Sequence, residues 1–96
     1  MSFSVELTPR AYQDINEIVD YIADQSGISR AENIRSRILA GLKLLEGMPT
    51  IYRLSTKLPG GRDLLFNGLP YVAPFEIIEQ RMIVVAVYHS RRDWQL

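Results

Sequence analysis

The apolar residues of this 96-residue sequence change their spacing once along the chain, and this change restricts the possible folds more than any other feature. Between residues 9 and 46 they recur every three or four positions, which is typical of helices with one buried face. After Gly60 and Gly61 they form three short runs separated by turn residues, which is typical of strands. A further run at residues 3–7 alternates apolar and polar side chains. The predicted order is therefore β-α-α-β-β-β, in the α+β class.

The two predicted helices carry recognisable signals at their ends. Thr8, followed by a proline, suits the N-cap of the first helix, and Gly27 suits its end. Ser29 and Glu32 have the spacing of a capping box at the start of the second helix. With about three or four residues between them, the helices are expected to form an antiparallel hairpin.

The last third of the chain predicts a small antiparallel sheet. The three predicted strands lie at residues 62–66, 70–78 and 82–89. Asn67 and Gly68 join the first two as a hairpin. The last run is apolar on both faces, so it is predicted to be the central strand. Pro74 lacks an amide hydrogen, so an edge or a bulge is expected there. We predict one domain over residues 1–96, with the helical hairpin packed on this sheet.

Composition restricts the chemistry of the chain. The absence of cysteine excludes disulfides and thiolate metal sites, and a single histidine argues against a zinc or iron centre. The first residues lack a secretory signal, and no apolar run reaches the roughly 20 residues of a membrane span. We therefore expect a soluble, cytoplasmic protein that uses no cofactor and no metal.

The zero net charge hides an uneven distribution of charged residues. Residues 1–29 contain one arginine and five acidic residues, whereas residues 30–62 contain seven cations and two acidic residues. Nine of the eleven cations are arginines, whose planar side chain suits carboxylate and phosphate groups. This favours an anionic partner, either a nucleic acid or an acidic peptide. A solvated helix face that balances the acidic helix before it would give the same pattern.

The segment YHSRRDW, at residues 88–94, contains side chains that metal-free RNA cleavage uses. Histidine is a common general base in proteins, so His89 could act as the base, while Arg91 and Arg92 could hold a phosphate. The alternatives are a strand-end histidine with a local hydrogen bond, and arginines that contact carboxylates. Trp94 suits either a partner anchor or a cover for the sheet edge.

Three stretches of the sequence, in this order, resemble the ParE/RelE family of bacterial toxins. LTPRAYQDINEIVDYI, at residues 7–22, is similar to the opening helix of the family. GGRDLLFNGLPYVAPFEI, at residues 60–77, is similar to the ParE-type stretch of Gly-x-Arg-acid, a turn and Pro-Tyr-hydrophobic. VVAVYHSRRDW, at residues 84–94, is similar to the closing strand.

The resemblance implies the same fold and leaves two activities open. RelE-like members cut mRNA on the ribosome with basic residues on the sheet face, and ParE-like members inhibit DNA gyrase. A small antitoxin neutralises both kinds. At positions that match the RelE-like basic residues, this chain has Arg62 and Asp63 with no lysine on one strand, and Tyr71 on the next. Only the closing histidine and arginines could match.

We therefore expect a ParE-like toxin of a type II toxin–antitoxin system that binds and inhibits gyrase. Its antitoxin is expected to lay an amphipathic helix and an extended segment along a hydrophobic groove, in a hetero-oligomer. The alternatives are a ribosome-dependent, metal-independent endoribonuclease that uses His89, Arg91 and Arg92, or an inert member kept for antitoxin binding. Arg62 and Asp63 are expected to form a structural pair. The candidate partner-binding residues are Arg35, Arg37, Arg53, Arg62, Arg91, Arg92 and Trp94.

Overall fold

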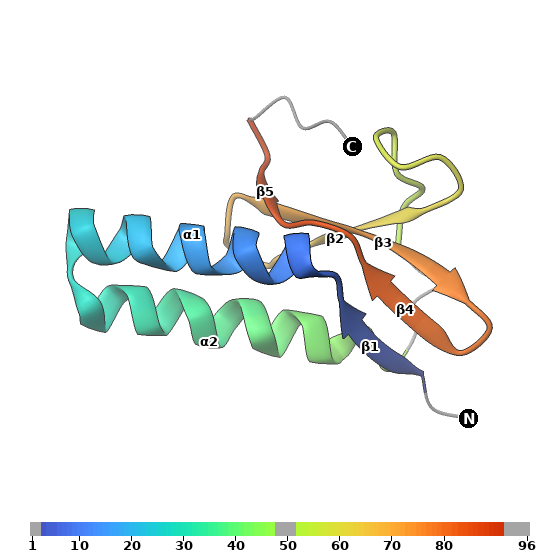
Figure 1. The fold of residues 1–96 in the computed structure, drawn as a ribbon, viewed down its shortest axis with the longest axis horizontal. Helices are drawn as coiled ribbons and strands as arrows, with labels where there is room; N and C mark the ends of the chain where they lie inside the picture. Colours follow the sequence, from blue (N-terminus) through green and yellow to red (C-terminus); the bar gives the residue numbers. More distant parts are fainter. Residues whose placement is uncertain (1–2, 48–51, 92–96) are drawn as a thin grey trace.

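The computed structural model describes residues 3–47 and 52–91, in which two helices pack on a five-stranded sheet (Figure 1). The elements are β1 (Ser4–Leu7), α1 (Pro9–Ser26), α2 (Ile28–Leu44), β2 (Arg62–Leu65), β3 (Tyr71–Ile78), β4 (Arg81–Val84) and β5 (Tyr88–His89). The predicted class and element order are confirmed, except that the last predicted strand is divided in two.

The two helices meet at a single residue. Thr8 caps α1 as predicted, because its Oγ1 accepts a hydrogen bond from the Ala11 amide at 3.1 Å. Gly27 ends α1 and is also the N-cap of α2, with a φ of 94° that favours glycine. The predicted capping box at Ser29 and Glu32 is therefore wrong, since α2 begins before Ser29. The expected linker of three or four residues is likewise reduced to one, and the helices lie side by side (Figure 1).

The sheet has the strand order β1-β4-β3-β2, and β5 pairs with β3 beyond the end of β4. All pairs are antiparallel except β1 with β4, so the sheet is mixed. A parallel pair requires a long connection, which the helical hairpin, β2 and β3 supply. The strand predicted to be central is central only in its first part. This part is β4, which lies between β1 and β3, whereas β5 pairs with β3 alone among the described strands.

A bulge divides this last run. Three residues, 85–87, face only two residues of β3, 73–74. The segment between β4 and β5 therefore contains one extra residue, which defines a bulge. Pro74 lies at this point, and its carbonyl accepts a hydrogen bond from the Val85 amide at 2.9 Å. The bulge that Pro74 predicts is therefore present, in the facing segment rather than in its own strand.

Two side chains from the start of α1 bind the backbone of this bulge. Thr8 Oγ1 donates a hydrogen bond to the carbonyl of Val85 at 2.8 Å. The carboxylate of Asp14 accepts a hydrogen bond from the amide of Val87 at 3.0 Å. A bulge interrupts the ladder locally, and these side chains satisfy backbone groups in it. They also fix the position of α1 relative to β5.

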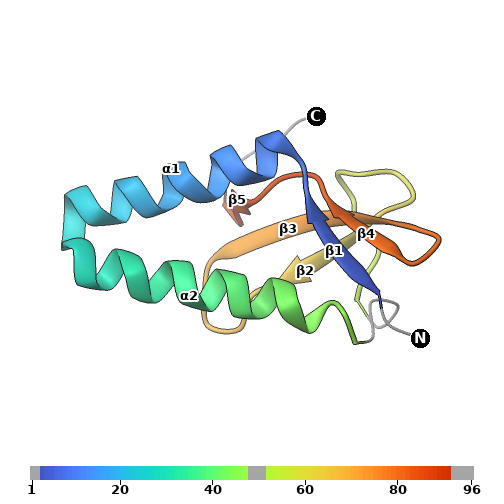
Figure 2. The same ribbon diagram turned by 60° about the horizontal axis from the view of Figure 1, so that its bottom comes forward.

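The main core lies between the helices and one face of the sheet. It contains the apolar stripes of both helices together with Leu64, Phe66, Ala73, Phe75, Met82 and Val84. Neighbouring strand residues point to opposite faces, so the second face carries a different set, with Val72, Ala86 and Tyr88 as a small cluster. The connection before β2, drawn in yellow, lies at the end of the molecule opposite the turn between the helices (Figure 2).

Candidate functional site

The predicted partner-binding arginines do not form one cluster. Arg35 and Arg37 lie on α2, where Arg35 Nε is 3.8 Å from Glu32 Oε2. Arg37 Nη2 donates a hydrogen bond to the carbonyl of Asn67 at 3.0 Å and so ties α2 to the β2–β3 turn. Both arginines therefore contact other residues of this chain, on the side of the molecule that carries the helices. Arg92 and Trp94 lie outside the described residues.

Arg53 and Arg91 lie at the second face of the sheet, whereas Arg62 is on the face that packs against the helices. Arg62 Nη1 donates a hydrogen bond to the carbonyl of Tyr52 at 2.6 Å, and Arg53 Nη2 binds Asp63 Oδ2 at 3.2 Å. The expected pair between Arg62 and Asp63 is therefore wrong, because adjacent strand residues point to opposite faces. Arg62 instead supports the connection.

A hollow of about 650 Å³ opens on this second face, and we call it the basic hollow. Its lining residues are Arg53, Thr56, Lys57, Leu65, Val72, Tyr88, Ser90 and Arg91. Among the described residues, the lining includes three cations, three hydroxyl groups and two apolar side chains, and no acidic side chain. Leu65, Val72 and Tyr88 form a row across β2, β3 and β5, because they are paired in the two ladders.

Asp63 lies beside this row and is only 2% exposed, the one buried charged residue in the described part of the chain. It binds Arg53 twice: its amide donates to the Arg53 carbonyl at 3.0 Å, and its Oδ2 accepts from the guanidinium. Its second oxygen, Oδ1, has no hydrogen-bond partner among the described residues. Asp63 thus fixes the position of Arg53, whose side chain is 58% exposed at the hollow.

Tyr88 forms one wall of the basic hollow and is itself largely buried. Burial raises the pKa of its hydroxyl above the ordinary value of 10.0, and the negative charge of Asp63 raises that pKa further. The hydroxyl therefore stays protonated at neutral pH, where it can act as a hydrogen-bond donor.

His89 lies on the opposite face of the sheet from the basic hollow. Its ring packs edge-on against Tyr71, with the ring centres 5.8 Å apart, and Tyr71 packs against the core under the helices. His89 Nδ1 accepts a hydrogen bond from the Arg91 amide at 3.1 Å, which is the local bond considered from the sequence. The predicted catalytic group is therefore divided, because Arg91 lines the hollow and His89 does not.

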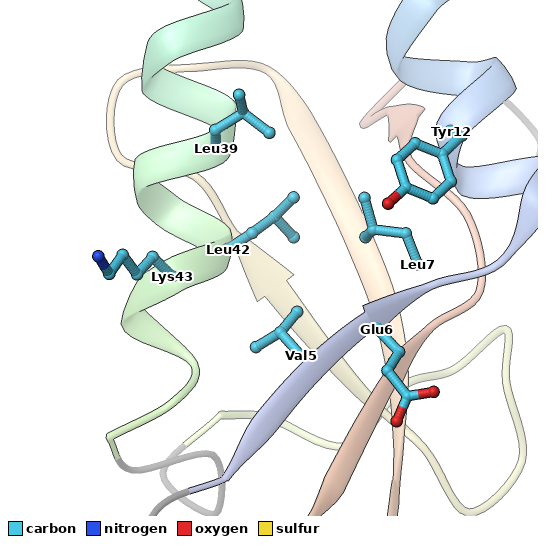
Figure 3. Close-up of a pocket in the computed structure, with 7 residues that line it drawn as sticks. All are labelled: Val5, Glu6, Leu7, Tyr12, Leu39, Leu42 and Lys43. Carbon is cyan, nitrogen blue, oxygen red and sulfur yellow. The ribbon is translucent and has the colours of Figure 1, made fainter.

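An apolar groove lies on the other side of the molecule, between β1, the start of α1, and α2 (Figure 3). It has a volume of about 430 Å³ and is lined by Val5, Glu6, Leu7, Tyr12, Leu39, Leu42 and Lys43. Tyr12 and Leu39 are 59% and 48% exposed, although both are large and apolar. Exposed apolar side chains around a groove are typical of an interaction surface.

One edge of β1 borders the same groove. Among the described strands β1 pairs only with β4, and the amides of Ser4 and Thr8 bond toward β4. The backbone groups of Val5 and Leu7 therefore point to the outer edge, since bonding directions alternate along a strand. An extended peptide can pair with such an edge.

Sequence reasoning missed Lys57, Thr56 and Ser90 as site residues. They lie in or beside irregular segments, where no periodicity indicates which way a side chain points. Within residues 3–47 and 52–91, no three His, Cys, Asp or Glu side chains are grouped as a metal site would require. Neither described helix is long and apolar enough to cross a membrane.

Comparison with family models identifies one family, and comparison with solved structures identifies a shared fold. The sequence model of a family described as "ParE toxin of type II toxin-antitoxin system, parDE" matches residues 5–94. A chain from a solved structure, "Chromosomal ParDE TA system from P. aeruginosa", superposes with a TM-score of 0.83 at 22% identity, covering 91% of this chain and 95% of that chain. This likeness shows a shared fold. A search of curated proteins found no match.

Proposed function

Because this chain belongs to the ParE toxin family of type II toxin–antitoxin systems, we propose that it inhibits DNA gyrase by binding. The observation that carries the proposal is the family match over nearly the whole described chain, at residues 5–94. The proposed place of action is the cytoplasm, where the enzyme and its DNA are found. In this proposal the toxin makes and breaks no bonds itself.

The arrangement of the second sheet face favours binding over RNA cleavage. Cleavage at a 2′-hydroxyl requires a general base within hydrogen-bond reach of the phosphate site. The basic hollow has cations and hydroxyl groups, but within residues 3–47 and 52–91 its lining includes no imidazole and no carboxylate. His89 packs against Tyr71 on the other face, and Asp63 is only 2% exposed. A phosphate held in the hollow would therefore have no base beside it among the side chains that the structure describes.

We further propose that a ParD-type antitoxin neutralises the toxin by occupying the apolar groove. An extended segment of the antitoxin would pair with the outer edge of β1, and its apolar side chains would pack between Tyr12 and Leu39. Acidic residues of the antitoxin would meet the exposed arginines, and the two proteins would form a hetero-oligomer. Both the open strand edge and the exposed apolar side chains support this location.

A charged side chain introduced into the apolar groove tests whether the antitoxin binds there. Leu39→Asp should weaken antitoxin binding at least about tenfold, or ~1.4 kcal/mol, because a carboxylate would lose its hydration beside an apolar partner. Ile28→Asp is the matched control, since Ile28 is 74% exposed in the first turn of α2 and does not line the groove. Isothermal titration with the purified antitoxin measures both variants. Equal binding by the two variants would place the antitoxin elsewhere.

Gyrase inhibition is tested with the purified toxin in a DNA supercoiling assay, beside a ribosome-programmed mRNA cleavage assay on the same preparation. Loss of supercoiling or trapped cleaved DNA, with intact mRNA, supports the proposal. Cut mRNA with unaffected gyrase overturns it, and loss of that cleavage in His89→Ala would assign the base. If neither assay responds and cells that express the toxin without antitoxin grow normally, the chain is an inert member of the family.

A further inference from the structure

We propose that the toxin associates with a second copy of itself through a cleft beside the turn between the helices, which we call the tip cleft. It has a volume of about 320 Å³ and lies between the helical hairpin and the β2–β3 turn. Its lining includes Tyr21 from α1, Arg30, Ile34 and Arg37 from α2, and Tyr71 from β3. Such self-association goes beyond the proposed function, because it needs neither gyrase nor antitoxin. The tip cleft shares no lining residue with the apolar groove.

The tip cleft borders the part of the helical hairpin that projects beyond the sheet. This projection is visible in both views (Figure 1, Figure 2). Tyr21 lines the cleft here and is 66% exposed, although it is a large aromatic residue. Tyrosine and arginine are the kinds of residue that most often dominate protein–protein binding, and both line this cleft. The lining therefore favours a protein as the ligand.

Charges of opposite sign lie on the two sides of Tyr21. Arg30 and Arg37 line the tip cleft from α2 and are exposed. Glu17 and Asp24 are also exposed, and they are neighbours of Tyr21 on the surface of α1 because they lie four residues before it and three residues after it. In the described part of the chain, neither Asp24 nor Arg30 has a hydrogen bond or ion pair through its side chain. Both are therefore available to a partner.

This arrangement is self-complementary under a two-fold axis. A two-fold interface brings the same surface of both copies together, so each contact occurs twice. With the axis beside Tyr21, Asp24 of each copy meets Arg30 of the other, and the two Tyr21 rings lie between these ion pairs. A net charge of zero means that two copies do not repel each other overall. An acidic segment of another protein would use the arginines alone, whereas a second copy uses the charges of both signs.

Sedimentation velocity of the full chain measures this association. Exposed ion pairs contribute little, and an interface around one cleft is small, so we expect a dissociation constant in the micromolar range. The unchanged toxin should therefore pass from monomer to dimer between about 5 µM and about 500 µM. Raising the salt concentration from about 0.05 M to about 0.5 M should weaken the dimer, because salt screens exposed charges.

Charge reversal tests the proposed ion pairs. Asp24→Arg and Arg30→Asp should each raise the dissociation constant at least about tenfold, since each brings like charges together at both contacts. An equimolar mixture of these two variants should associate as the unchanged toxin does, because opposite charges then meet at both contacts. Mixing does not rescue a variant that fails to fold, so this result separates pairing from misfolding. Arg35→Asp is the control, as it reverses a charge on α2 at a residue that does not line the tip cleft.

Three outcomes would overturn the inference. These are an unchanged toxin that stays monomeric at the highest concentration, charge-reversal variants that associate as Arg35→Asp does, and a mixture that stays monomeric. If the unchanged toxin is monomeric, weaker antitoxin binding by Arg30→Asp would assign the tip cleft to the antitoxin, and weaker inhibition of supercoiling would assign it to gyrase. A toxin that forms the dimer without inhibiting gyrase refutes the gyrase proposal alone.

Discussion

Replacing Arg53 by alanine should destabilise the fold far more than the loss of an exposed arginine normally does. The guanidinium donates a hydrogen bond to Asp63 Oδ2 at 3.2 Å, and Oδ1 already has no partner among the described residues. In Arg53→Ala the carboxylate of Asp63 would stay 98% removed from solvent with its charge uncompensated, if the surrounding structure did not open. Unpaired buried charges are among the few single changes with large effects on stability.

The magnitude follows from the exposure of the two partners. Removing one partner of a fully buried ion pair costs about 3–5 kcal/mol. Arg53 is 58% exposed, so water already weakens this pair and can partly replace it. We therefore expect a loss of about 2 kcal/mol, within the range for an unsatisfied buried polar group. In a domain of this size that loss lowers the melting temperature by roughly 8–16 °C.

Thermal denaturation followed by circular dichroism measures this loss, and a double variant tests its cause. Asparagine at position 63 has no charge to compensate, so Arg53→Ala with Asp63→Asn should be about 1 kcal/mol more stable than Arg53→Ala alone. Arg30→Ala, an exposed control, should change stability by less than about 0.5 kcal/mol. If the double variant is instead destabilised by the sum of the two single effects, the buried charge is not the cause.

Three further changes test other contacts by denaturation. Gly41→Ala should destabilise the fold, because the added Cβ would lie 2.6 Å from the buried ring of Phe66. Overpacking costs about 1–3 kcal/mol, which outweighs the gain of about 1 kcal/mol in helix propensity. A more stable Gly41→Ala variant would contradict this. Thr8→Val should cost about 2–3 kcal/mol, the sum of a lost N-cap and a lost hydrogen bond to the bulge, whereas Thr8→Ser should retain most of both. The hydrogen bond from Arg81 lowers the pKa of Glu6 below its ordinary value of 4.5. The Glu6–Arg81 pair therefore stabilises the fold fully above pH 4.5, and this stabilisation is lost as the pH falls through the lowered pKa. Urea denaturation at about pH 6 and about pH 3 should therefore show a smaller acid-induced loss in Glu6→Gln than in the unchanged protein.

Local signals in the sequence predict the helices and strands, but not how one element is connected to the next. Thr8 marked the start of α1 because capping depends on neighbouring residues alone. The capping box at Ser29 was wrong because Gly27 serves both helices, and nothing in the local pattern shows that one residue can end one helix and begin the next. Pro74 predicted the bulge, since a missing amide hydrogen must leave a gap in some ladder. Which strand carries the extra residue depends on register, which is a tertiary property.

The candidate site was less predictable for the same physical reason. His89 and Arg91 are two residues apart, and the sequence pattern predicts that they belong to one group. In the structure the chain leaves the strand after His89, so the spacing no longer indicates a shared face. Lys57 comes from an irregular connection whose path is set by the segments around it. Charge counts located the arginine-rich middle of the chain, but only the fold separates the arginines of α2 from those at the hollow.

Asp63 is the residue at which sequence and fold conflict most. Its position in β2 is as buried as that of Leu64, so a chain under selection for stability alone would gain from an apolar side chain there. Buried charges are weak evidence of stability, and local conflicts of this kind gather at functional sites. What the carboxylate achieves is to hold Arg53 over the basic hollow. An apolar residue at position 63 would leave the Arg53 guanidinium without this hydrogen-bond partner. The buried carboxylate therefore favours a function for the second face of the sheet that is separate from the apolar groove.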